Sequence, residues 1–276
     1  IGMFDGVHLG HQQVIRQAVS DAHQLEASSL CVTFDKHPST VIATERAPLL
    51  IQSLDQRLEA IRALSVDATL VLPFDEAMSQ IPADAFIQGL AVDLGRISSI
   101  CVGTQFAFGQ GRKGNVELLH QLGQELHFVT HGTASVALDG ETVSSTRIRQ
   151  AIAGGQLDLA GQMLGREYAL AGKVIRGDQR ARELGFPTAN LEITGRCTPP
   201  NGVYAAHAEV DGEPYRAAVN IGLRPTIKDP DPTLHVEAHL LDFDEEIYDR
   251  VCALTFVGKL REEQSFDSLD ALRAQI

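Results

Sequence analysis

The chain opens with the stretch Ile1-Gly2-Met3-Phe4-Asp5-Gly6-Val7-His8-Leu9-Gly10-His11-Gln12, from which the fold can be worked out. Its apolar beginning is typical of the end of a strand, and Asp5-Gly6 is a common turn sequence. A helical pattern of apolar residues begins near Gly10. The sequence therefore predicts a strand, a tight turn and a helix in direct succession.

Two histidines lie on this turn. His8 and His11 are three positions apart, so both side chains can face the same point beside the N-terminus of the helix. Free backbone N–H groups and the helix dipole make such an N-terminus suited to binding a phosphate. Two imidazoles at this point can donate hydrogen bonds to the charge that builds up on a phosphorus during transfer. The alternative is a polar turn with two solvated histidines.

Composition limits the class of protein. Of the 276 residues, 44% are hydrophobic and 21% are charged, as in soluble globular proteins. No apolar run approaches the ~20 residues that span a bilayer, and no signal-peptide pattern is evident. The net charge of −13 argues against broad nucleic-acid binding but is compatible with binding ATP. The four cysteines are widely spaced, which favours a reducing cytoplasm.

The first half of the chain alternates strands and helices. We expect strands at 30–34, 69–74, 99–103 and 127–130, and helices at 53–64, 83–94, from about 116 and from 145. This alternation predicts a parallel sheet with helices on both faces, as in α/β folds of the Rossmann type. Ligands of such sheets bind outside the carboxyl ends of the strands, which is where His8 and His11 lie.

The pattern changes after Gly154-Gly155. A short helical segment at 157–164 precedes five predicted strands, at 168–175, 202–210, 215–221, 234–243 and 251–257. Asp211-Gly212 is a hairpin signal between two of them. Antiparallel strands in this number predict a small closed barrel, followed by an amphipathic helix at 268–276. We predict domains at 1–160 and 161–276, with the boundary near 155–167.

A second motif in the first half carries phosphate-binding groups. Ser144 or Ser145 caps the helix that follows, and the hydroxyls, the freed N–H groups and Arg147 can together grip a triphosphate. Capping of the helix is the simpler role for these serines.

The sequence Phe-Asp-Gly-Val-His-Leu-Gly-His-Gln at 4–12, paired with Ser-Ser-Thr-Arg-Ile-Arg at 144–149, resembles the nucleotidylyltransferase superfamily and its FMN adenylyltransferase branch. The resemblance covers residues 1 to about 155. It implies that His8 and His11 stabilise the α-phosphate of ATP while the phosphate of FMN attacks and pyrophosphate leaves, which is catalysis by positioning and electrostatics. The implied ATP contacts in this half are Gly2, Phe4, Gly6, Gly10, Ser144, Ser145, Thr146 and Arg147.

The resemblance also implies a flavin side of this pocket. Substrate contacts are implied at Asp35, His37, Pro38, Gln105, Phe106 and Arg112. Members of the family usually have Asn where Met3 stands, Pro where Lys36 stands, and Asn or Asp-like residues where Gln105 stands. These departures concern flavin binding rather than ATP binding.

A glycine-rich segment, Gly109-Gln110-Gly111-Arg112-Lys113-Gly114, matches the pattern of dinucleotide-binding sites. Its context differs, because Phe106-Ala107-Phe108 intervenes after the strand and no carboxylate stands ~20 positions further on in the required role. We interpret it as a mobile loop whose Arg112 and Lys113 contact phosphate. An ordinary flexible loop is the alternative.

Two groups in the second half carry chemistry. Thr188 and Asn190 offer neutral oxygens two positions apart on an extended segment, which suits a Mg²⁺ ion that already carries phosphate oxygens. A polar turn is the alternative for this pair. Glu237 interrupts an apolar strand and shares a face with His235 and His239, so it either faces solvent or is retained as a base.

These groups belong to motifs that together resemble riboflavin kinase from about Tyr168 to the end: Gly-Phe-Pro-Thr-Ala-Asn at 185–190, Asn-Ile-Gly-Leu-Arg-Pro-Thr at 220–226 and Val-Glu-Ala-His-Leu-Leu-Asp-Phe at 236–243. The resemblance implies a six-stranded barrel in which Thr188 and Asn190 hold Mg-ATP. Glu237 would take the proton from the ribityl 5′-hydroxyl as its oxygen attacks the γ-phosphate.

The resemblance extends to the surroundings of this second site. Further ATP contacts are implied at Gly172, Gly177 and Pro187, and substrate contacts at Asn220 and Arg224. The glycine- and arginine-bearing stretch 172–185 would be a flap over the phosphates. Ala181 stands where the family commonly has glycine, which restricts the backbone of that flap.

Both halves together resemble the bacterial bifunctional riboflavin kinase/FMN adenylyltransferases, also called FAD synthetases. ATP, riboflavin, FMN and FAD are then the implied ligands, with Mg²⁺ accompanying ATP, and no nucleic acid or membrane. One alternative is a nucleotidylyltransferase acting on another phosphate ester. A flavin-binding regulator without catalysis is disfavoured by the intact polar residues, and a nucleic-acid-binding barrel is disfavoured by the acidic charge.

Overall fold

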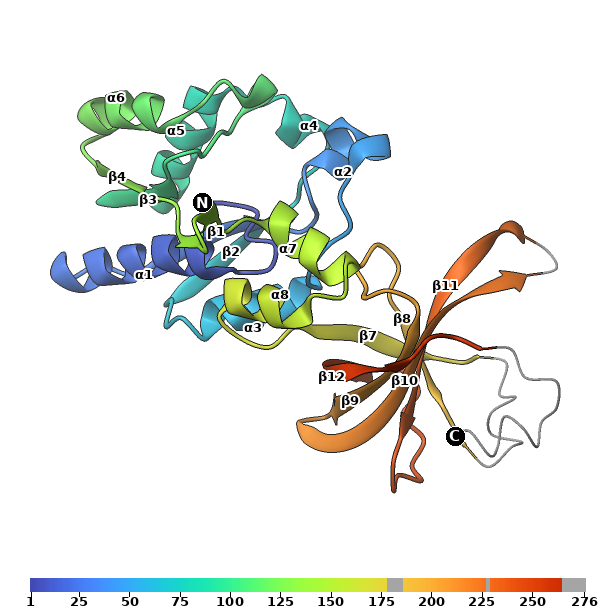
Figure 1. Ribbon diagram of the computed structural model, residues 1–276. Helices are drawn as coiled ribbons and strands as arrows, with labels where there is room; N and C mark the ends of the chain where they lie inside the picture. Colours follow the sequence, from blue (N-terminus) through green and yellow to red (C-terminus); the bar gives the residue numbers. More distant parts are fainter. Residues whose placement is uncertain (178–185, 227–228, 265–276) are drawn as a thin grey trace. The chain divides into compact units, whose positions relative to one another are not determined.

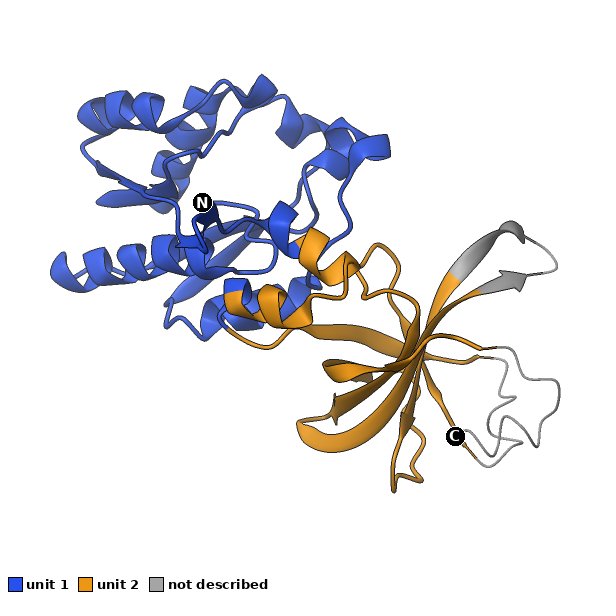
Figure 2. Ribbon diagram, in the orientation of Figure 1, with its two compact units in different colours: residues 1–148, 163–165 blue, residues 149–162, 166–276 orange. Residues whose placement is uncertain are grey.

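The computed structural model describes residues 1–177, 186–226 and 229–264. The chain forms two compact units, residues 1–148 with 163–165 and residues 149–162 with 166–276 (Figure 2). The first unit contains helices and parallel strand pairs, and the second contains an antiparallel barrel (Figure 1). The predicted fold class is therefore confirmed. The domain limits 1–160 and 161–276 stay a prediction.

Parallel strand pairing organises the first unit. β1 pairs with β2 and β3 pairs with β4, both in parallel, whereas β5 and β6 form a short antiparallel hairpin. The elements are α1 (Leu9–Gln24), β1 (Leu30–Phe34), α2 (Ser39–Ile42), η1 (Thr44–Arg46), α3 (Leu54–Arg62), β2 (Ala68–Leu72), α4 (Glu76–Ser79), α5 (Ala83–Leu94), β3 (Ser99–Gly103), η2 (Gln110–Arg112), α6 (Val116–Leu126), β4 (Val129–Thr133), β5 (Ala137–Leu138) and β6 (Glu141–Thr142).

Local chemistry explains where these elements start and stop. Ser53 caps α3 in a reciprocal capping box with Gln56, as the sequence predicted for a helix beginning there. β2 ends at Leu72, before Pro73, since proline has no N–H for the ladder. His127 adopts the left-handed conformation that ends α6, so β4 begins at Val129 instead of residue 127.

The opening segment departs from the expectation of a strand. Residues 1–4 are not assigned to a strand, although Gly2 N donates to Val32 O of β1 at 3.0 Å. The extended backbone stops at Phe4 because that residue adopts a positive φ of 52°.

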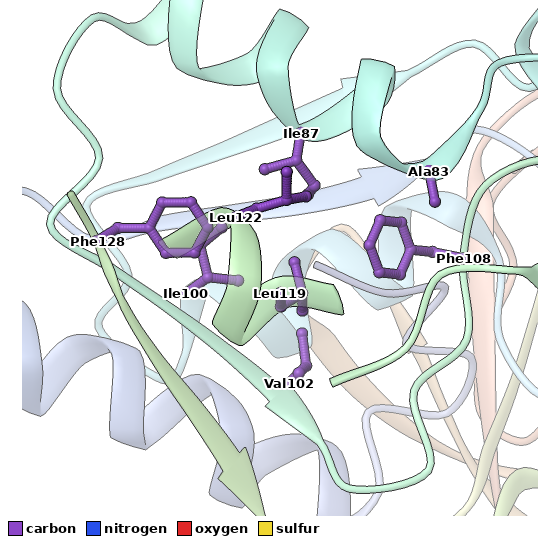
Figure 3. Packing of buried hydrophobic residues seen from close by; sticks show 8 residues of the cluster. All are labelled: Ala83, Ile87, Ile100, Val102, Phe108, Leu119, Leu122 and Phe128. Atoms are coloured by element: carbon purple, nitrogen blue, oxygen red, sulfur yellow. The ribbon is translucent and has the colours of Figure 1, made fainter. Parts of the chain in front are cut away.

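A buried apolar cluster supports the part of this unit around β3 (Figure 3). Ile100 and Val102 of β3 pack with side chains of α5 and α6, including Ile87 and Leu119, both of which have no exposed surface. The cluster consists of Ala83, Ile87, Ile100, Val102, Phe108, Leu119, Leu122 and Phe128. It anchors β3, whose carboxyl end leads into the predicted flavin contacts.

The helices α7 (Ser145–Ala153) and α8 (Leu157–Leu164) lead along the chain to a closed barrel with the strand order β10-β11-β8-β7-β12-β9. The strands are β7 (Ala169–Ile175), β8 (Ala189–Glu192), β9 (Gly202–Val210), β10 (Glu213–Thr226), β11 (Asp229–Leu240) and β12 (Val251–Arg261). The five predicted strands correspond to all of these except β8, whose four residues are too few for a periodic signal.

Alternation of side chains fills the barrel. On β9 the buried residues are Gly202, Tyr204, Ala206, Ala208 and Val210, with exposed or half-buried residues between them. The predicted hairpin turn joins β9 to β10, and Asp211 and Gly212 adopt φ values of 53° and 86° there. The predicted helix at 268–276 lies outside the described residues.

Truncation of Ile87 to alanine should lower the free energy of unfolding of the first unit by about 2–5 kcal/mol, because the side chain is fully buried and leaves a cavity. Val92 lies on the same helix and is 81% exposed, so Val92→Ala should change the value by less than about 0.5 kcal/mol. Urea unfolding followed by circular dichroism measures both. Equal losses for the two variants would show that the cluster is not the core described here.

Candidate active sites

A strained turn presents the histidines of the first unit. Phe4 and Val7 adopt positive φ values of 52° and 39°, a conformation that costs non-glycine residues roughly 1–3 kcal/mol each. Gly6 lies between them at 87°, with Ile51 and Leu164 close to its Cα. Val7 N donates to Phe4 O at 2.9 Å and closes the turn.

Hydrogen bonds from distant parts of the unit hold this turn. The Asp5 carboxylate accepts from Ile51 N at 3.1 Å and from Gln52 N at 3.4 Å. Gln12 Nε2 donates to Val7 O at 2.9 Å. Ser145 Oγ donates to the Asp5 carbonyl at 2.8 Å, which brings the serine motif to the histidine motif. The two predicted phosphate-binding motifs therefore meet, as their functional interpretation requires.

The imidazoles of His8 and His11 stack with their ring centroids 3.6 Å apart. His8 is the N-cap of α1, and its Nδ1 accepts from His11 N at 3.3 Å, which leaves Nε2 as the N–H donor of the neutral ring. The rings of Phe4 and His11 pack in a T-shaped arrangement with their centroids 5.3 Å apart, and the buried His11 Nδ1 has no hydrogen-bond partner among the described residues. Burial, followed by the neighbouring His8, lowers the pKa of His11 well below its usual value.

The remaining predicted ATP contacts of this unit lie around the same turn. Gly10 lies against the His8 ring and Gly2 against the Phe4 ring. Ser144 Oγ accepts from Arg147 N at 3.2 Å at the start of α7, as expected of a cap, and Thr146 is exposed.

Arg147 stabilises the β5–β6 hairpin through hydrogen bonds and an ion pair. Its Nη1 donates to Leu138 O at 3.0 Å and to Glu141 O at 3.1 Å, and its Nε lies 3.1 Å from the Glu141 carboxylate. Contact of this guanidinium with a triphosphate stays a prediction.

Arg57 is a residue of this site that the sequence analysis missed. It lies on α3, is 3% exposed, and donates from Nη1 to Met3 O at 3.0 Å and from Nη2 to Phe34 O. Its spacing in the sequence could have identified it. Arg57 lies three residues after Leu54 and four before Ile61, which places an arginine on the apolar face of the helix.

The predicted flavin contacts follow β1 and β3. The Asp35 carboxylate accepts from Phe74 N and Lys36 N, each at 2.8 Å, and His37 Nδ1 accepts from Ser39 N at 3.1 Å, next to Pro38. These bonds order the loop after β1 and leave the Lys36 side chain exposed.

After β3, Gln105 is exposed and the Phe106 ring stacks on Phe108 at 5.2 Å. The glycine-rich segment is closed by backbone pairing of Phe108 with Gly114, and it contains the 3-10 turn η2 with exposed Arg112. Gly109 and Gly114 pack directly on Ala83.

A row of polar residues crosses three adjacent strands of the barrel in the second unit. Asn190 of β8 lies opposite Glu237 of β11, and Glu237 lies opposite Asn220 of β10. Val236 and Ala238 point into the barrel and are buried, so this row lies on the outer face, as the strand parity predicted. Directly opposite residues have Cβ atoms about 4.5–5.5 Å apart, so the three side chains can act on one ligand.

The structure also places other residues that the sequence analysis predicted as ligand contacts in this unit. His239 Nδ1 lies 2.9 Å from Pro187 O, which links β11 to the segment carrying Thr188. Gly177 lies so close to the Asn190 carboxamide that a Cβ atom there would be 2.4 Å from it. Gly172 lies within β7, opposite Cys252. The Arg224 side chain and residues 178–185, with Ala181, lie outside the described part of the chain.

The chemical type of the side-chain oxygens at the predicted Mg²⁺ site indicates which ion they could bind. Thr188 and Asn190 supply neutral oxygens, which suit Mg²⁺. Among the described residues there is no cluster of three or more His, Cys, Asp or Glu side chains that could hold a metal ion. The chemistry of the donors therefore fits an ion that arrives with the phosphates of a nucleotide.

Comparisons with known proteins match the two parts of the chain to two different families. A sequence model described as FAD synthetase matches residues 1–147, and one described as riboflavin kinase matches residues 164–276. A bifunctional riboflavin kinase/FMN adenylyltransferase of Pseudomonas fluorescens is 38% identical over 276 residues, covering 100% of this chain and 88% of that protein. The protein of the same description from Escherichia coli strain K12 is 36% identical over 277 residues, with the same coverage.

A solved structure titled macrolide-efflux protein, from Streptococcus pneumoniae, has a TM-score of 0.82 and 28% identity and covers 100% of this chain and 89% of its own. Within the described residues of this chain, no helix has the length and apolar character needed to cross a membrane. The description of the Streptococcus pneumoniae structure differs from those of the curated relatives. The descriptions of the relatives agree with one another and with both family matches, and we therefore assign the family from them.

The lowered pKa of His11 should make the first unit less stable in mild acid. The unfolded chain takes up a proton at this residue near pH 6.5, whereas the folded chain does so at lower pH. Stability should therefore fall as the pH decreases below about 6.5, by up to about 1.4 kcal/mol per pH unit from this group. Urea unfolding of the wild type and of His11→Gln, at several pH values, measures the effect. A wild-type-minus-variant difference that does not change with pH would contradict it.

Proposed function

Because the chain belongs to the bifunctional riboflavin kinase/FMN adenylyltransferase family, it converts riboflavin to FMN and FMN to FAD, and we propose that its two domains divide these reactions. Residues 161–276 carry the kinase reaction and residues 1–160 carry the adenylyl transfer. The observation that carries this assignment is that each set of motif residues converges within its own unit. Ser145 bonds Asp5 in the first, and Asn190, Glu237 and Asn220 align in the second.

In the adenylyl transfer, His8 and His11 stabilise the negative charge on the α-phosphate of ATP as FMN attacks and pyrophosphate leaves. Because His8 Nδ1 accepts a hydrogen bond as the cap of α1, Nε2 carries the N–H of its neutral ring. Nδ1 of the neutral His11, which has no hydrogen-bond partner among the described residues, can bind a ligand. The N-termini of α1 and α7 add backbone N–H groups and dipoles. Contacts to ATP come from Gly2, Phe4, Gly6, Gly10, Ser144, Ser145, Thr146 and Arg147.

The acceptor, FMN, binds along the loops after β1 and β3. The contacting residues are Asp35, His37, Pro38, Gln105, Phe106 and Arg112. Exposed Arg112 supplies positive charge, and Phe106 supplies an aromatic surface. Testing FMN against other phosphate esters with labelled ATP decides whether this acceptor is the right one.

In the kinase reaction, Glu237 takes the proton of the riboflavin 5′-hydroxyl while that oxygen attacks the γ-phosphate of ATP, the bond from the γ-phosphorus to the β-phosphate oxygen breaks, and ADP leaves. Thr188 and Asn190 hold the Mg²⁺ that accompanies ATP, and the ion supplies charge neutralisation on the phosphates. Asn220 and Arg224 contact riboflavin, and Gly172, Gly177 and Pro187 contact ATP. The register that places Asn190 opposite Glu237 supports this arrangement, since it brings the phosphate-binding residues beside the base.

A cytoplasmic location follows from the proposed chemistry and from the cysteines. Cys31, Cys101, Cys197 and Cys252, all of which lie among the described residues, are buried thiols that form no disulfide, as is usual in a reducing compartment.

A time course tests the whole assignment. The protein is incubated with riboflavin, ATP and Mg²⁺, and FMN and FAD are separated chromatographically. FMN should rise first and FAD should follow, and both should stop when Mg²⁺ is removed by a chelator. Formation of neither product by the folded protein would refute the proposed substrates.

Single substitutions should separate the two reactions. His8→Ala should lower FAD formation by about 10²–10³-fold and leave FMN formation unchanged, because it removes a donor to the transition-state charge. Glu237→Ala should lower FMN formation by about 10²–10⁴-fold, because it removes the base, and leave FAD formation unchanged when FMN is supplied. Each variant is the control for the other. Loss of both activities in each folded variant would show that the two-site assignment is wrong.

A further inference from the structure

Arg57 of α3 joins two chain segments that lead to different sides of the adenylyltransferase site. Its Nη1 donates to Met3 O at 3.0 Å and contacts Met3 Sδ at 3.2 Å, while Nη2 donates to Phe34 O. Met3 leads into the strained turn that carries the histidines. Phe34 is the last residue of β1 and leads into the loop of Asp35.

The first branch connects Arg57 to His11. The Met3 carbonyl accepts from Arg57 and also from Thr33 Oγ1, at 3.2 Å, so it is held from two sides. The next residue, Phe4, adopts a φ of 52°, and its ring packs against the His11 imidazole in a T-shaped arrangement with 5.3 Å between the centroids. A shift of the Met3 carbonyl would therefore move the support of His11.

The second branch connects Arg57 to the flavin-side loop. Asp35 follows directly on the Phe34 carbonyl, and its carboxylate orders the loop by accepting from Lys36 N and Phe74 N. Asp35 N also donates to Leu72 O of β2 at 3.1 Å. The carbonyl held by Arg57 therefore sets where this loop begins.

We propose that Arg57 is a positioning residue for adenylyl transfer that fixes the distance between the turn of His8 and His11 and the loop beginning at Asp35. This rests on the proposed function of the first unit. A guanidinium suits the task because its planar fork holds two acceptors in fixed directions, which the single ammonium of lysine does not. Transfer of a group between two bound substrates is sensitive to such spacing, since a 1 Å displacement can cost about 100-fold in rate.

The test compares Arg57→Lys with the wild type in the full-length chain. FAD formation from FMN and ATP should show a kcat about 10–100-fold lower, with the KM for ATP changed less than about threefold, because geometry is lost while the ATP contacts remain. FMN formation from riboflavin by the same preparation should stay within about twofold.

Arg62→Lys is the matched control, because Arg62 lies on the same helix but is exposed and pairs with Glu59 at the surface. FAD formation within twofold of the wild type in Arg57→Lys would overturn the proposal. A loss that accompanies disappearance of the thermal unfolding transition of the first unit would also overturn it, since a residue that only stabilises the fold behaves in that way. Absence of FAD formation by the wild type would instead refute the proposed function itself.

Discussion

The proposed adenylyltransferase site depends on a backbone turn that is unfavourable by itself. Phe4 and Val7 adopt positive φ values, and such residues persist only where surrounding contacts over-determine them. Those contacts come from far along the chain: Ile51 and Gln52 bind the Asp5 carboxylate, and Ser145 binds its carbonyl. Strain in the turn is thus offset by the same bonds that bring the phosphate-binding motifs together. The contacts that form when this unit folds are consequently the same contacts that position the histidines.

The two proposed sites both position residues beside phosphate groups, but they do so with different backbone structures. In the first unit, helix N-termini and the helix-capping His8 would face the expected phosphates, so part of the positive potential comes from the backbone. In the barrel, the outer faces of three paired strands hold Asn190, Glu237 and Asn220 in register. Both arrangements place chemistry on rigid elements, which suits reactions that depend on geometry more than on proton transfer.

Much of this could be predicted from the sequence because its signals are local. Several elements, including β1, β3, α5 and β9, begin and end where periodicity and caps predict, and the parity of Glu237 follows from alternation alone. The missed features depend on distant contacts. The non-strand backbone of residues 1–4 results from the strained Phe4, β8 is too short to show a period, and the role of Arg57 depends on carbonyls of two other segments. No pattern within a few residues contains that information.

The alternation of side chains along β11 determines how mutations in this strand affect the barrel. Val236, Ala238 and Leu240 fill the barrel, while His235, Glu237 and His239 face outward, so the demands of stability and of chemistry fall on separate, interleaved positions. Either set can change by substitution without direct effect on the other. An insertion or deletion of one residue would exchange the two sets at once, burying the carboxylate and exposing the core. A change in the length of this strand should therefore disturb the barrel and the row of Glu237 more than most single substitutions in it.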